Sequence, residues 1–263
     1  MLNTLANHGY IPRDGRNILA GEITSALHDV IGISAFITTM FTLPIFFVHQ
    51  DSPQPSDSPP SVWKSALDYL EHPTLIFRHW GMRRPSQTHP VSGKRCLNLD
   101  QLGMEGVIEH DISLTRRDRA QGDCIFPQRD LIEALLACRA NGDNGACDDS
   151  QNDAENLSIK DLAEYRRRRI PAQKEENPDA VYGGLQHSFA CMEIALLVGT
   201  FGDGDEVRVA FARASSQEER LPFQEGWDWR RRKAGWRGGR RLGILRLGRL
   251  FKLVKVNFDR ISG

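Results

Sequence analysis

The chain has 263 residues, of which 40% are hydrophobic and 26% charged, as is ordinary for a globular protein with one sizeable core. Its five cysteines are odd in number and show no Cys-x-x-Cys or other metal spacing, which argues against a disulfide framework, although a Cys138–Cys147 bridge stays open. The net charge of zero hides an asymmetry, because residues 229–263 carry twelve Lys or Arg and one acid, whereas the rest carries 22 basic and 33 acidic residues.

The N-terminal stretch begins with a polar opening, MLNTLANHGYIPRDGR, in which Pro12 and Gly15 mark a turn. Apolar spacing after Asn17, the expected N-cap, predicts a helix over residues 17–48. Residues 30–48 contain no charge, so their length alone makes them a candidate membrane span. Their glycine, proline and threonines favour instead a buried core helix that ends near Pro44.

The rest of the chain alternates helical patterns with long loops. Residues 51–62 are rich in proline and serine and predict a surface loop. Ser158 and Asp161 form a near capping box, and Pro171 is expected to stop the helix that follows at about Arg169. Helices are predicted over residues 63–72, 127–139, 158–169, 189–201 and 207–214. Without repeats or convincing strands, the predicted fold class is all-α, in a single helical domain.

The densest polar cluster of the body is Glu109-His110-Asp111-Ile112-Ser113. Two carboxylates, an imidazole and a hydroxyl in five residues can hold a hard cation, and oxygen ligands suit Mg²⁺ or Mn²⁺. Glu109 and Ser113 lie four residues apart and would share a face on a helical turn. His110 beside Asp111 would be oriented to handle protons. The simpler interpretation of these residues alone is a solvated turn with an aspartate cap.

A single acid, Glu193, interrupts the apolar segment FACMEIALLVGTF. An unpaired charge in such a segment costs several kcal/mol to bury, so the carboxylate needs a partner or a proton. That environment suits general acid–base work. The alternative interpretation places Glu193 at the solvent edge of an amphipathic helix.

Four stretches carry a family resemblance when they are taken together and in this order: LNTLANHGYIPRDG at the N-terminus, LDQLGMEGVIEHDISLTRRD, NPDAVYGG with SFACMEIALLVGTFGD, and the closing RLPFQEGW. They resemble the signatures of the fungal heme-thiolate peroxidases, the family of chloroperoxidase and unspecific peroxygenase. The resemblance implies a chloroperoxidase-like helical array around a heme pocket. The implied activity is oxidation of a small organic substrate with hydrogen peroxide, either as a broad peroxygenase or within fungal secondary metabolism.

The resemblance also implies residue roles. Glu193 would be the catalytic acid–base group, with His110 positioning it. Glu109 and Ser113 would bind a Mg²⁺ or Mn²⁺ ion beside a propionate of heme b, together with the backbone carbonyl of His110. Asn7 and His8 would lie in the segment that binds the cofactor. A secreted monomer without a nucleic-acid partner is expected, although residues 1–16 do not form a signal peptide.

The two ends of the chain depart from the family pattern. In the family a Cys-Pro pair stands one residue before the equivalent of Leu2-Asn3, so the chain is expected to begin just after the pair that supplies the iron ligand. We assign residues 1–227 to the peroxidase-like domain and 228–263 to a basic tail. The tail is either a membrane or nucleic-acid segment or a mispredicted terminus. Two other functions stay open: an inactive relic of the family, and a membrane-associated binding protein.

Overall fold

The fold is predominantly helical, which confirms the predicted all-α class. The structure is a computed structural model that describes residues 1–49, 81–103, 111–122, 124, 126–138, 156–180, 182–231 and 241–262. The predicted loop over 51–62 and helix over 63–72 lie outside these residues. The helices are α1 (Leu2–Asn7), α2 (Ala20–Asp29), α3 (Ala35–Ile45), α6 (Arg129–Leu136), α7 (Ile159–Glu176), α8 (Gly184–Phe201), α9 (Val209–Ser216) and α10 (Ile244–Ser262).

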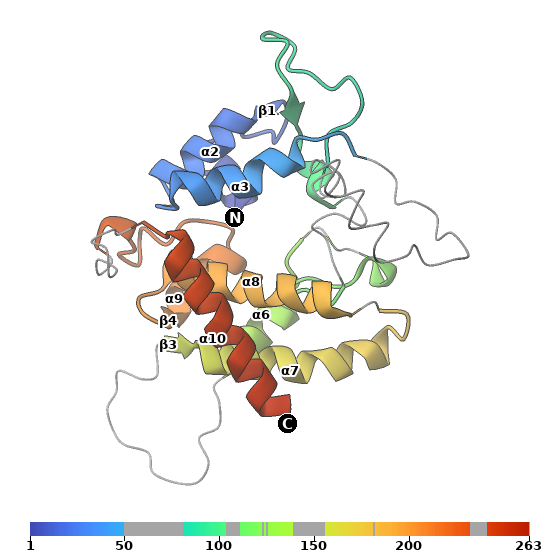
Figure 1. Ribbon diagram of the computed structural model, residues 1–263, viewed down its shortest axis with the longest axis vertical. Helices are drawn as coiled ribbons and strands as arrows, with labels where there is room; N and C mark the ends of the chain where they lie inside the picture. The colour runs from blue at the N-terminus through green and yellow to red at the C-terminus, as the bar shows by residue number, and fades with distance from the viewer. Residues whose placement is uncertain are drawn as a thin grey trace, which may run out of the picture.

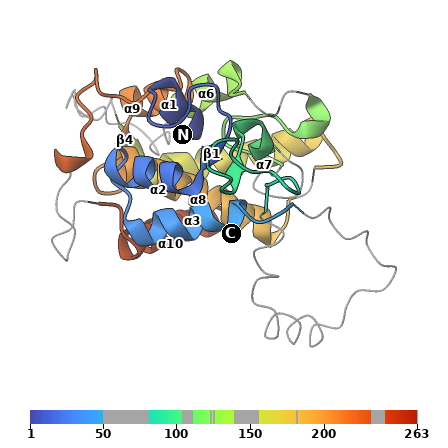
Figure 2. The same ribbon diagram turned by 90° about the horizontal axis from the view of Figure 1, so that it is seen from above.

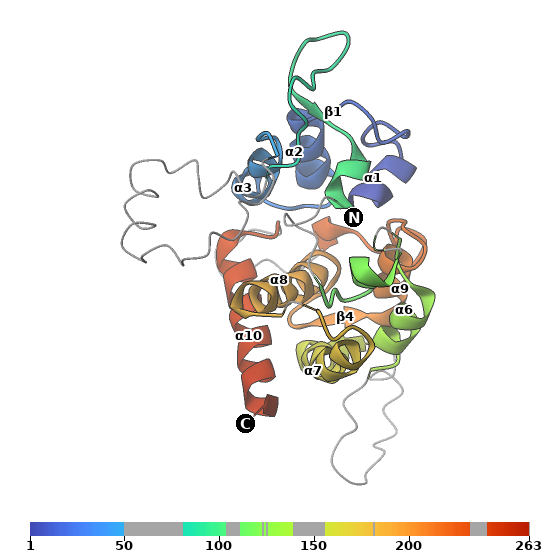
Figure 3. The ribbon, with the colours of Figure 1, turned by 90° about the vertical axis from the view of Figure 1, so that its right-hand side faces the viewer.

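Two short antiparallel ladders accompany the helices. β1 (Ile18–Leu19) pairs with β2 (Cys96–Leu97), and β3 (Asn156–Ser158) pairs with β4 (Glu206–Arg208). Figures 1 and 3 show two layers: α1, α2, α3 and β1 lie in one, and α6 to α10 lie in the other. In the second layer α10 crosses α7 and α8 and packs against both (Figure 1).

The predicted helix over residues 17–48 is two helices, and this prediction was wrong in its continuity. Asn17 has a φ of 54° and does not cap a helix; α2 begins after Leu19, whose N–H donates to Glu22 Oε2 at 2.7 Å. The break between α2 and α3 contains Gly32, with a φ of +75°. A Cβ there would lie 2.4 Å from two ring carbons of Trp229. Only glycine tolerates both constraints.

The apolar stretch after the break forms α3. Its buried side includes Ile37 and Ile45, in agreement with the core-helix interpretation, whereas Phe36 and Leu43 face outward. Among the helices that the structure describes, none combines the length and the apolar character needed to cross a membrane.

Helix α7 begins as predicted but ends later. Ser158 and Asp161 form a reciprocal capping box: Asp161 N–H donates to Ser158 Oγ at 3.2 Å, and Ser158 N–H donates to Asp161 Oδ2 at 2.9 Å. The helix then continues through Pro171 to Glu176, so the predicted stop was wrong. Pro171 is exposed. Arg169 and Gln173, two residues before and after it, make hydrogen bonds with Ser113 and Asp118. Those contacts outweigh the proline penalty of about 3 kcal/mol.

The basic tail contributes structure of its own. Leu242 N–H donates to Gly32 O at 2.8 Å, and Ser34 N–H donates to Leu242 O at 2.9 Å. Helix α10 buries Leu247, Leu250 and Val254 in the main core. These three apolar residues of α10 pack in the layer of α7 and α8, whereas Ile244 and Leu245 are exposed. The division into domains at residue 227 stays a prediction.

Candidate active site

Two residues predicted for different roles lie next to each other. Glu193 lies on α8. Ser113 lies in a loop and precedes Glu193 by 80 residues in the chain. Ser113 Oγ donates to Glu193 Oε1 at 3.3 Å, and the Glu193 side chain is 34% exposed. The carboxylate is thus oriented by a hydroxyl, and its Oε2 atom is buried although the side chain as a whole is partly exposed.

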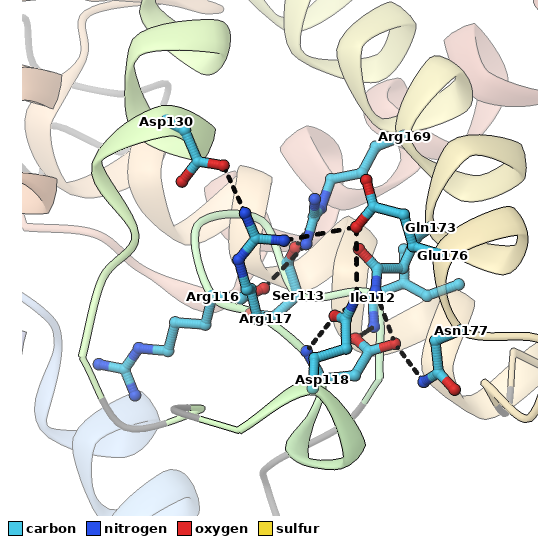
Figure 4. Close-up of polar contacts among 11 residues, drawn as sticks. Ile112, Ser113, Arg116, Arg117, Asp118, Asp130, Arg169, Gln173, Glu176 and Asn177 are labelled. Carbon is cyan, nitrogen blue, oxygen red and sulfur yellow. Dashed lines mark hydrogen bonds and ion pairs between the residues drawn. The ribbon is translucent and has the colours of Figure 1, made fainter.

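The loop that presents Ser113 contains a strained residue. Ile112 is fully buried and has a φ of 59°, a left-handed conformation that is a genuine outlier for a β-branched side chain. Such a conformation costs about 1–3 kcal/mol and persists only where surrounding contacts enforce it. Here the Ile112 N–H donates to Asp118 Oδ1 at 2.6 Å (Figure 4).

Helix α7 supplies the contacts that enforce the loop conformation. The buried Asp118 accepts from Gln173 Nε2 at 3.1 Å and from Asn177 Nδ2 at 3.0 Å through its Oδ2. Arg169 donates to the carbonyls of Ser113 and Arg116, each at 2.8 Å (Figure 4). The backbone at Ser113 is therefore held from two sides, and α7 fixes the position of the Ser113 hydroxyl relative to α8.

The second neighbour of Glu193 is Arg166 of α7, whose side chain is 1% exposed. Its Nη1 lies 3.9 Å from Glu193 Oε2, and its Cζ lies 5.6 Å from the centre of the Tyr182 ring. Within the described part of the chain none of its guanidinium nitrogens donates a hydrogen bond. A buried guanidinium with five N–H groups is costly unless a negative charge lies near it, and the Glu193 carboxylate supplies that charge here.

Sequence reasoning missed Arg166 because it lies in a run of four arginines that resembles a solvated face. The helical period separates them: Arg166, Arg169 and Gln173 are spaced i, i+3, i+7 and are all buried. Arg167 and Arg168 lie on the outer side and pair with Glu164. This i, i+3, i+7 spacing is the feature of the sequence that distinguishes the inward-facing arginines.

The predicted metal site falls mostly outside the described residues, because Glu109 and His110 lie there. Where the structure does describe the chain, no group of three or more His, Cys, Asp or Glu is placed to hold a metal ion. Ile112 is left-handed and residues 111–118 form no helix, whereas Glu109 lies outside the described residues, so the shared face of Glu109 and Ser113 stays a prediction.

Asn7 and His8 lie at a different place, where the first and last signature stretches meet. Asn7 Nδ2 donates to Glu219 O at 3.1 Å, and His8 Nε2 accepts from Leu221 N–H at 3.0 Å. His8 therefore carries its proton on Nδ1. Figures 2 and 3 show α1 beside α9, the helix that leads into this segment.

The closing stretch RLPFQEGW is itself a folded turn. Arg220 makes two hydrogen bonds to Glu225, at 2.8 and 2.5 Å. Trp227 is buried, and its Nε1 donates to Thr200 O at 3.2 Å, which fastens the turn to the end of α8.

Comparison with known proteins identifies the family. The family model described as "Peroxidase, family 2" matches residues 1–234, which is most of the chain. The chain belongs to peroxidase family 2. A search among curated proteins returned no match to the sequence. Membership in this family makes the protein a peroxidase, with heme as the implied cofactor and hydrogen peroxide and an organic substrate as the implied reactants.

The residues described for this family 2 peroxidase fit one side of a heme site. Glu193, Ser113 and Arg166 supply a carboxylate, a hydroxyl and a buried cation within a few ångströms of one another. A cysteine binds the heme iron only as a thiolate, so its thiol must lose its proton. Burial raises the pKa of Cys96, of Cys138 to about 12 and of Cys191 to about 11, so without a bound metal these thiols are protonated. Cys138 is a free thiol, and Cys147 lies outside the described residues.

Proposed function

We propose that this protein is a heme-dependent peroxidase or peroxygenase that oxidises a small organic substrate with hydrogen peroxide, and that Glu193 is its acid–base group. The observation that carries the proposal is the pairing of Glu193 with Ser113 at 3.3 Å beside the buried Arg166 at 3.9 Å. One acid in an apolar helix thus lies between a neutral donor and a fixed positive charge.

The chemistry needs such a carboxylate. When bound, heme would supply the iron that accepts the oxidising equivalents of hydrogen peroxide. Cleavage of the O–O bond requires that one proton moves from one peroxide oxygen to the other. The Glu193 carboxylate would take that proton and return it, a type of catalysis worth about 10²–10⁴ in rate.

Each neighbour of Glu193 fixes the position of its carboxylate in a different way. Ser113 Oγ donates to Oε1 and leaves Oε2 on the side of Arg166. Arg166 is always charged and attracts the carboxylate, so it holds Glu193 toward α7. Asp118 and Arg169 fix the loop and thereby the position of the Ser113 hydroxyl.

Four further roles complete the proposal and rest on the family signatures. His110 positions Glu193, and Glu109, Ser113 and the His110 carbonyl bind Mg²⁺ or Mn²⁺ next to a heme propionate. Asn7 and His8 line the cofactor, and their side chains are fixed by residues 219–221. Secretion belongs to the same family expectation.

The experiment compares the hemin-loaded wild type with Glu193→Gln, Glu193→Asp and Glu206→Gln. Glu206 is exposed on β4 and serves as the matched control. Peroxide-dependent oxidation of a phenol should fall about 100-fold in Glu193→Gln, partly return in Glu193→Asp and stay unchanged in Glu206→Gln, with equal heme uptake. Full turnover in Glu193→Gln would remove Glu193 from the reaction.

A second candidate is a family member that binds heme without turnover. The absorption spectrum of the reduced carbon monoxide complex separates the two. A strongly red-shifted Soret band indicates thiolate ligation and supports the peroxidase. An unshifted band together with no peroxide consumption supports the non-catalytic protein.

A further inference from the structure

A tyrosine–histidine pair lies beside the candidate site and takes no part in the chemistry above. Tyr182 lies two residues before α8, next to its N-cap Gly183, and His187 lies in the first turn of the helix. The Tyr182 hydroxyl and His187 Nδ1 are 3.1 Å apart, and the other ring nitrogen, Nε2, lies 3.6 Å from Cys191 Sγ. In the neutral tautomer with the proton on Nε2, Nδ1 accepts the phenol proton and Nε2–H faces the sulfur.

Both groups have the protonation state that proton transfer needs at neutral pH. Burial lowers the pKa of His187 below 6.5, Lys255 and Arg166 lower it further, and Asp259 opposes them. Burial also raises the pKa of Tyr182 above 10, against the effect of Arg166. A neutral imidazole therefore faces a protonated phenol.

Arg166 connects this pair with Glu193. Its guanidinium lies 5.6 Å from the Tyr182 ring centre and 3.9 Å from Glu193 Oε2. A buried positive charge beside the ring opposes a cationic tyrosyl radical. Removal of an electron from Tyr182 therefore requires that the phenol proton leaves with it, and His187 Nδ1 is the base in hydrogen-bond reach.

We propose that Tyr182 is a one-electron oxidation site of this protein, with His187 as its proton acceptor. Tyr182 gives one electron to the peroxide-oxidised enzyme, and its proton moves to His187 Nδ1, which leaves a neutral tyrosyl radical and an imidazolium. A phenol or aromatic amine from solution then gives one electron to Tyr182 and releases its own proton to water, and the proton on His187 returns to the tyrosine oxygen. The source of the oxidising equivalent rests on the proposed function; the pair itself does not.

The chain contains a matched control in Tyr165 of α7. Its hydroxyl donates to Leu131 O at 2.9 Å, and burial raises its pKa to about 12. A backbone carbonyl cannot take up the proton, so Tyr165 should resist oxidation although it is also close to Arg166 in sequence. The two tyrosines therefore differ in whether a base lies in position to accept the phenol proton.

The first arm of the test uses an external oxidant and no heme. The full chain is flashed with a ruthenium tris-bipyridine sensitiser and persulfate, and tyrosyl radicals are measured by freeze-quench electron paramagnetic resonance. The signal should fall at least fivefold in Tyr182→Phe, stay unchanged in Tyr165→Phe and form at least tenfold more slowly in His187→Phe. Spin-trap adducts in the wild type, located by mass spectrometry, should lie on Tyr182 and need no variant.

The second arm adds peroxide to the hemin-loaded protein and repeats the adduct analysis. Adducts on Tyr182 in both arms support the proposal. A radical on Tyr182 under light with no peroxide turnover supports the pair and removes the proposed function alone. Peroxide turnover without adducts on Tyr182, or an unchanged light-driven signal in Tyr182→Phe, overturns the proposal.

Discussion

Asp118 accepts the backbone N–H of Ile112 at 2.6 Å, and this contact holds a left-handed, β-branched residue one position before Ser113. The same carboxylate accepts from Gln173 and Asn177, so one buried side chain joins the loop to α7. The strain at Ile112 is therefore maintained by α7 and transmitted to the hydroxyl that faces Glu193.

Replacing Asp118 with alanine should destabilise the protein strongly. Three donors would lose a charged acceptor in a buried place, which costs about 3–5 kcal/mol in the free energy of unfolding. Urea unfolding of the full chain measures this. Asp130→Ala is the control, because Asp130 is an exposed partner of Arg117 and should cost about 1 kcal/mol or less. Equal losses in the two variants would contradict the role of Asp118.

Replacing Arg166 with methionine should destabilise the fold and weaken turnover. Glu193 Oε2, the oxygen that faces Arg166, is buried, so the substitution leaves this carboxylate without its neighbouring cation. Removing one partner of a buried ion pair costs about 3–5 kcal/mol in the free energy of unfolding. Thermal unfolding and peroxide turnover are measured on the same samples. An unchanged or higher melting temperature would show that Arg166 does not serve stability.

Replacing Gly32 with alanine should be among the most damaging single changes. The new Cβ would lie 2.4 Å from the Trp229 ring, in a backbone conformation that alanine avoids. Strain and overpacking together predict a loss of about 3 kcal/mol or more. Gly204→Ala has a similar positive φ but open space around it, so it should lose only about 1 kcal/mol. Urea midpoints that coincide for the two variants would refute the clash with Trp229.

Stability should decline in alkaline solution through Cys138. Its pKa is about 12 in the folded state, whereas an unfolded thiol ionises near 9, so only the unfolded chain loses this proton as the pH rises above about 9. The contribution is complete below pH 9 and is lost progressively up to pH 12. Urea unfolding at pH 8, 9 and 10 of the wild type and Cys138→Ala checks this, and the variant should show the shallower decline. Parallel slopes would exclude Cys138 as the cause.

Local patterns predicted the parts of the structure that depend on neighbouring residues. The Ser158–Asp161 capping box and the apolar helix around Glu193 follow from spacing alone, and the family signatures selected Ser113 and Glu193, which lie 3.3 Å apart. Distant contacts decided the rest. The break at Gly32 depends on Trp229, and the passage of α7 through Pro171 depends on the loop at residues 112–118. Arg166 became a candidate only when its burial was known.

The meeting of α1 with residues 219–221 has a consequence for biosynthesis. Asn3 donates to Glu219 at 3.1 Å, and these residues are 216 positions apart in the chain. Contacts of such long range form late and slow the search for the native state. A ribosome releases residue 221 many seconds after residue 3, because synthesis proceeds at about 5–20 residues per second. During that interval α1 lacks this partner and exposes Leu5 and Ala6, which makes nascent α1 a target for chaperones until residues 219–221 have been synthesised.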